Sequence, residues 1–142
     1  MDPSLYEIFQ AVVNVAKTVD GIETGYPVPP DAAPPQANLP AVLIVPGEFQ
    51  ITGGDSELWS YTWQMHALIE QGDDLAARSH VLLPFLKPIV VAFRSQTTLG
   101  LPNTYGVHID GGVLGAVAYL DATYLAITYR MSGKQKFSAT YG

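Results

Sequence analysis

The chain has 142 residues and a formal net charge of −6, with 7 lysines and arginines against 13 aspartates and glutamates. Only 14% of the residues are charged, whereas roughly 25% is typical of soluble domains. The basic residues are scattered along the sequence without a basic stripe, which argues against high-affinity nucleic-acid binding. The length suits one α+β domain, and the low charge predicts that parts of its surface contact other subunits. The alternative is a well-packed monomer whose surface is rich in Tyr, Thr and Ser.

Cysteine is absent, which excludes disulfides, thiolate metal sites and a cysteine nucleophile. The N-terminus lacks the basic and apolar regions of a signal peptide, so we expect the protein to be made and assembled in the cytoplasm. The longest apolar stretch, residues 81–93, is short and is interrupted by Pro84, Lys87 and Pro88. We therefore expect no membrane span.

The first element is an amphipathic helix over residues 3–19. Asp2 is a suitable N-cap, and Ser4 with Glu7 forms a possible capping box one register later. Apolar residues follow at the 3.6-residue period, and Gly21 is the natural end of the helix.

Residues 22–40 contain six of the 11 prolines. Because proline fixes φ and lacks an N–H group, this composition predicts a long, semi-rigid loop without regular structure. A polyproline ligand for an SH3-type partner is the alternative, but no basic anchor flanks these prolines.

A long half-buried strand is predicted over residues 57–70, where aromatic and apolar residues alternate with polar ones. Twelve residues of this tract in strand conformation span roughly 40 Å, about twice the usual strand length. One end of the strand is therefore expected to overhang the core. The buried strand 41–45 precedes it, and a flexible turn over 49–57 would join the two in an antiparallel hairpin. Trp59 would then become an interface anchor at the overhanging end.

A second helix is predicted to begin at Asp73 and Asp74 and to be kinked or split by its two prolines. Three further strands follow at 105–110, 112–120 and 123–131, with a tight turn at Asp110-Gly111-Gly112, and residues 132–142 form a mobile tail. The predicted order is α-β-β-α-β-β-β. It describes an α+β fold with two helices packed on one face of a mostly antiparallel, mixed β-sheet that carries a long hairpin.

Catalytic and metal-binding motifs are not recognisable. The three histidines lie on three different elements without metal-ligand spacing, and nucleophile-elbow, Walker and dinucleotide-binding patterns are absent. We therefore predict a protein that is not an enzyme and needs no cofactor or metal. The alternative is a small α+β enzyme or ligand-binding domain, in which Arg94, His108 and Asp110 would be the first residues to test.

The order of elements resembles the tail terminator (tail completion, or head–tail joining) proteins of long-tailed bacteriophages. The resemblance covers nearly the whole chain. It rests on the N-terminal helix, the Pro-rich crossing, the segment Leu39–Glu48 and the long strand after it. The Asp-capped second helix and the Gly-rich strands with Tyr119 and Tyr124 complete the match.

This resemblance implies a structural virion protein of the tail or neck that forms a homohexameric ring at the head-proximal end of the tail tube. Such a ring ends tube polymerisation and joins the tail tube protein to the head–tail connector or stopper, while DNA passes through the lumen without specific binding. Another neck ring, such as a stopper or adaptor, is the alternative. The candidate assembly residues are Glu48, Phe49, Gln50, Asp55, Glu57, Trp59, Tyr61, Pro29 and Pro30.

Overall fold

The computed structural model describes residues 3–54 and 56–138. Its elements are α1 (Leu5–Ala16), β1 (Thr24–Tyr26), a single 3-10 turn η1 (Gln36–Asn38), β2 (Ala41–Thr52), β3 (Ser56–Gln71), α2 (Leu75–Arg94), β4 (Thr104–Tyr119) and β5 (Ala122–Ser138). The predicted α+β class, with helices on a mixed sheet, is confirmed.

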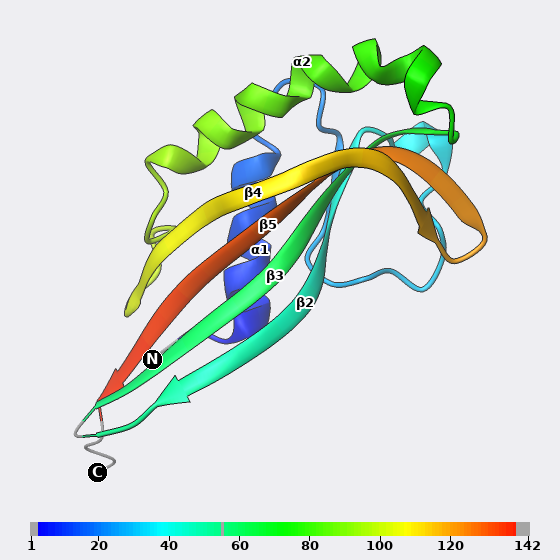
Figure 1. Cartoon of the computed structure of the whole chain (residues 1–142). Helices are drawn as coiled ribbons and strands as arrows, with labels where there is room; N and C mark the ends of the chain where they lie inside the picture. Colours follow the sequence, from blue (N-terminus) through cyan, green and yellow to red (C-terminus); the bar gives the residue numbers. More distant parts are fainter. Residues whose placement is uncertain (1–2, 55, 139–142) are drawn as a thin grey trace.

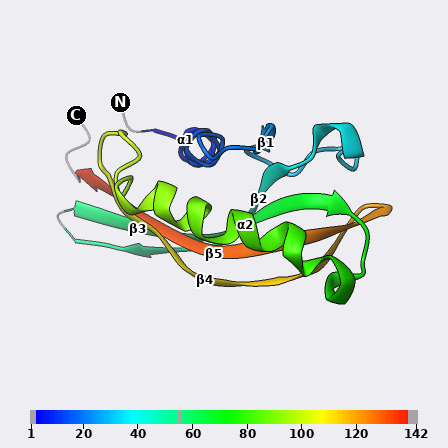
Figure 2. The same ribbon diagram turned by 90° about the horizontal axis from the view of Figure 1, so that it is seen from above.

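The five strands form one sheet in the order β1-β2-β3-β5-β4 (Figure 1). Only the short β1 pairs in parallel, with β2, and all other neighbours are antiparallel. Both helices lie over the same face of the sheet, as Figure 2 shows. The opposite face is called the helix-free face below.

The larger core lies between the helices and the sheet. Phe9 of α1 packs edge-on against Trp63 of β3, with ring centroids 5.4 Å apart, and Leu82 and Ile89 of α2 are fully buried. Odd-numbered residues of β3 supply the sheet side of this core, as the alternation predicts. A smaller cluster lies on the helix-free face around Leu43, Leu68 and Tyr124.

Helix α1 begins later and ends earlier than predicted. Ser4 is its N-cap, and the full capping box with Glu7 is present. The alternative cap, Asp2, lies outside the described residues. The helix ends at Ala16, because Lys17 to Val19 close in tighter turns.

The Pro-rich segment is more ordered than expected. It contains β1 and η1, and it covers part of the helix-free face. The Tyr124 hydroxyl donates to the Pro34 carbonyl oxygen at 2.6 Å, and the Tyr119 hydroxyl donates to that of Pro30. Tertiary hydrogen bonds therefore fix a segment for which proline predicts only a loop.

The predicted turn over residues 49–57 is wrong, because strand pairing continues almost to the end of the hairpin. Phe49 to Thr52 pair with Tyr61 to Leu58, after a bulge between Pro46 and Phe49. The bulge takes up Gly47, where a side chain would collide with the Thr62 carbonyl oxygen.

Helix α2 is one continuous helix, so the predicted split at Pro84 and Pro88 is wrong, and the predicted kink stays a prediction. Asp74 caps it by accepting a hydrogen bond from the Ala77 amide at 3.2 Å. By length and composition alone α2 could cross a membrane, and such a helix was not expected. It lies on the sheet instead, with Leu82, Ile89 and Phe93 buried.

Two predicted strands, 105–110 and 112–120, are a single strand. Gly111 lies at a bulge in β4 rather than in a turn, and β4 pairs with β5 on both sides of it. The chain turns once, at Leu120 and Asp121.

The predicted mobile tail is also wrong as far as Ser138. Residues 132–138 continue β5 between β3 and β4. Gly133 lies under the Trp63 ring, and Gln135 is buried, where its side-chain amide accepts from the Tyr61 hydroxyl and donates to the Pro3 carbonyl oxygen. Residues 139–142 of that prediction lie outside the described chain.

Candidate assembly interface

The hairpin end of β2 and β3 projects past both helices (Figure 1). Cross-strand pairing places Phe49 and Ile51 of β2 on the same face as Trp59 of β3, and Phe137 of β5 lies beside them. Phe49 stacks on Trp59 with centroids 5.7 Å apart, and Phe137 meets Trp59 edge-on at 6.0 Å. These four residues are called the tip patch.

The tip patch is open to solvent. Phe49 is 61% exposed and Ile51 is 48% exposed, while Trp59 and Phe137 are half-buried. The helices end before this region, so its apolar side chains have little cover from the described part of the chain. Large aromatic side chains in such a position are typical of the anchors of protein–protein contacts.

Two predicted interface residues, Glu57 and Tyr61, support the tip patch from beside it and are not part of its exposed surface. The Glu57 carboxylate accepts a hydrogen bond from the Trp59 indole N–H at 3.0 Å, which fixes the ring. Tyr61 is only 8% exposed, and burial raises the pKa of its hydroxyl. Tyr61 therefore belongs to the core beside the patch.

The other hairpin residues lie on different sides of it. Glu48 occupies the bulge, where its amide donates to the Thr62 hydroxyl at 3.1 Å. Gln50 pairs with Ser60 and is exposed on the helix-free face. Asp55 lies outside the described residues.

The two prolines of the predicted interface are remote from the tip patch. The Pro30 carbonyl oxygen binds Tyr119, which precedes the β4–β5 turn at the other end of the sheet. Pro29 is exposed next to it. The structure therefore does not bring Pro29 and Pro30 together with the hairpin residues.

Sequence reasoning missed part of the exposed apolar surface. Ile51 was not singled out because residues 49–57 were expected to be a turn, and Phe137 was not singled out because residues 132–142 were expected to be a mobile tail. The outer face of α2 exposes Leu83 (55%) and Val91 (54%) beside its two prolines. The high hydropathy of residues 75–94, more than one buried stripe requires, was the signal for this face.

The residues of the enzyme alternative lie on two elements, Arg94 at the end of α2 and His108 and Asp110 on β4. His108 and Asp110 are paired, with Nε2 2.6 Å from the carboxylate, and Ser132 approaches the same nitrogen at 3.3 Å. In a catalytic triad the serine and the acid contact different ring nitrogens. Here Nδ1 faces the Gly106 carbonyl oxygen at 2.6 Å, so no nitrogen is placed to take a proton from Ser132 while the acid orients the ring.

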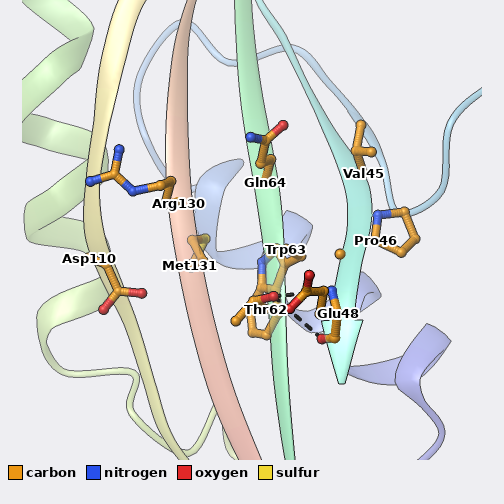
Figure 3. A pocket seen from close by; sticks show the side chains of 10 residues that line it. Val45, Pro46, Glu48, Thr62, Trp63, Gln64, Asp110, Arg130 and Met131 are labelled. Carbon is orange, nitrogen blue, oxygen red and sulfur yellow. Dashed lines mark hydrogen bonds between the residues drawn. The ribbon is translucent and has the colours of Figure 1, made fainter. Parts of the chain in front are cut away.

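Arg94 and His108 line a common depression with α2 residues, but no hydrogen bond or ion pair joins them in the described chain. Another depression of about 350 Å³ crosses the helix-free face at the β2 bulge (Figure 3). Glu48 lies on one side of it, and Asp110 and Arg130 lie on the other. Among the residues that the structure describes, no three His, Asp or Glu side chains are grouped as a metal site.

Comparison with protein-family models finds no family that matches this chain, and no curated protein matches its sequence.

Proposed function

We propose that this chain is a non-enzymatic structural protein that assembles into a ring. The ring would lie at the head-proximal end of a bacteriophage tail tube, end tube polymerisation and join the tail to the head connector. The observation that supports assembly most directly is the tip patch, an exposed aromatic cluster on a hairpin that projects beyond the core. The assignment to the tail is supported by the resemblance in the order of elements.

Burying the exposed parts of Phe49, Ile51 and Trp59 against a neighbour would remove apolar surface from solvent, at about 25 cal/mol per Å². A hairpin that extends past its own helices reaches a second subunit without moving the core. Paired strands also hold the aromatic rings rigidly, so little conformational entropy is lost on contact.

Native mass tests the proposal. Light scattering over a range of protein concentrations, with negative-stain imaging of each species, should show an annular particle near six copies, 6 × 15.3 ≈ 92 kDa. Purified tail tubes added as a template should carry the particle at one end. A compact dimer that persists at high concentration, without a ring in the presence or absence of tubes, would contradict the proposal.

A pair of matched variants tests the tip patch itself. Phe49→Ser should prevent assembly and leave the monomer folded, because Phe49 is already 61% exposed. Val113→Ser is the control, since Val113 is 60% exposed on β4 and pairs with Thr128, seven residues along β5 from Gln135, the partner of Trp59. Equal assembly of the two variants would remove the tip patch from the interface.

A further inference from the structure

The structure gathers basic residues that are separated along the sequence. Arg130, Lys134 and Lys136 alternate along β5 with the buried residues Met131 and Gln135. All three basic side chains are therefore exposed on the helix-free face. At about 3.3 Å per residue they span roughly 20 Å. We call these three residues the basic strip; they are three of the 7 lysines and arginines.

The strip has little compensating charge around it. On β3, the residues opposite Lys134 and Lys136 are Ser60 and Leu58. Within residues 3–54 and 56–138 neither lysine forms an ion pair. Arg130 shares the depression of Figure 3 with Glu48 and Asp110, but Asp110 is paired with His108.

Acidic residues collect at the opposite end of the sheet. Asp31 and Asp121 line one depression beside the β4–β5 turn. The Gly72 amide donates to the Thr123 carbonyl oxygen at 2.9 Å, which places Asp73 and Asp74 next to the same turn. All four carboxylates are exposed, and we call them the acidic end. The nearby Arg78 is paired with Glu70 at 2.8 Å. Its positive charge is therefore used by Glu70 and does not neutralise the acidic end.

We propose that the basic strip of one protomer binds the acidic end of a second copy of this chain. The inference rests on the proposed ring and names two surfaces that would form it. The strip carries +3, so the rest of the chain carries −6 − 3 = −9, and a second copy therefore offers a complementary surface. Because the two surfaces differ and lie at separate places, the contact can repeat head-to-tail around a ring.

DNA fits the strip less well. Three cations neutralise few phosphates, and the net charge of −6 repels a polyanion.

The test exchanges the charges of the two surfaces. A strip variant carries Lys134→Glu and Lys136→Glu, and an end variant carries Asp73→Lys and Asp121→Lys. Each alone should raise the protein concentration needed for assembly by about tenfold or more, because like charges then meet at every contact. Lys17→Glu with Lys87→Glu is the control, since it makes the same change in charge as the strip variant at exposed positions elsewhere.

Mixing gives the decisive measurement. An equimolar mixture of the strip and end variants should assemble again, because each contact then joins opposite charges. Sedimentation velocity at about 50 mM and about 500 mM NaCl should also show weaker wild-type assembly at the higher salt.

The outcomes separate the two proposals. A wild-type ring with an equally competent strip variant, or variants that fail to recover on mixing, would overturn this inference and leave the ring. A wild-type chain that stays monomeric at both salt concentrations, with and without tail tubes, would overturn both. Duplex DNA bound by the strip at about 150 mM salt would assign the strip to phosphates instead of a second copy.

Discussion

His66 lies on the helix-free face of β3, where its Nδ1 is 2.7 Å from the Thr128 hydroxyl. Burial lowers the pKa of this histidine from the ordinary value of 6.5, because the imidazolium loses solvation there. The neutral ring is thus the form that the fold accommodates. The unfolded chain takes up this proton at a higher pH than the folded chain does, so stability falls as the pH falls below about 6.5.

Replacing His66 by glutamine should reduce this acid sensitivity. The expected result is a smaller loss of unfolding free energy between pH 7.5 and pH 5 than in the wild type, whatever the stability of the variant at pH 7.5. Urea unfolding of both proteins at the two pH values measures the difference. His80→Gln is the control, because His80 is exposed. An equal pH dependence of His66→Gln and the wild type would contradict the role assigned to burial.

At the scale of the element, β4 shows how glycine changes the prediction. Two consecutive glycines after Asp110 are typical of a turn, but here they allow a bulged strand to run close to its neighbour. A Cβ atom on Gly112 would collide with the Thr128 carbonyl oxygen of β5, whereas Gly115 has open space at the same position. Close approach of the two backbones is therefore what requires glycine at 112.

Gly112→Ala should lower the free energy of unfolding by about 1–3 kcal/mol, because β4 must move away from β5 to admit the methyl group. Gly115→Ala, three residues along the same strand, is the matched control and should be close to neutral. Thermal or urea unfolding of the two variants measures the contrast. Equal stabilities would show that β4 and β5 are not packed as closely at Gly112 as the structure indicates.

For the whole molecule, the distribution of charge matters more than its sum. The sequence has a net charge of −6 and scattered basic residues, yet folding places three of them on one exposed strand face. The earlier expectation that no basic stripe exists is therefore wrong for the folded chain. The expectation that DNA is not bound tightly stays a prediction.

Three cations allow about three phosphate contacts, so the logarithm of any affinity for duplex DNA should fall with the logarithm of salt with a slope no steeper than about −2.7. Fluorescence anisotropy with a labelled duplex should show no saturable binding at physiological salt. A steeper slope, or tight binding under those conditions, would show that further basic residues contact the nucleic acid.

The sequence by itself determined the local features. Alternation along residues 57–70 predicted β3 and its buried face, because side-chain direction in a strand depends only on position. Ser4, Glu7 and Asp74 marked helix starts for an equally local reason: each satisfies amide groups within its own first turn. Trp59 was singled out from the alternating strand, whereas Phe49 was named among the candidate assembly residues from the predicted turn, and the two lie together in the tip patch.

Only the tertiary structure decided which segments are paired. The polar stretch 132–138 becomes a strand because β3 and β4 lie on both sides of it, and the prolines of α2 are accommodated in a helix that packs along the sheet. The separation of Pro29 and Pro30 from the tip patch, and the assembly of the basic strip and the acidic end, depend on strand order. Contacts between residues far apart in the chain fix that order, and local sequence patterns carry no information about them.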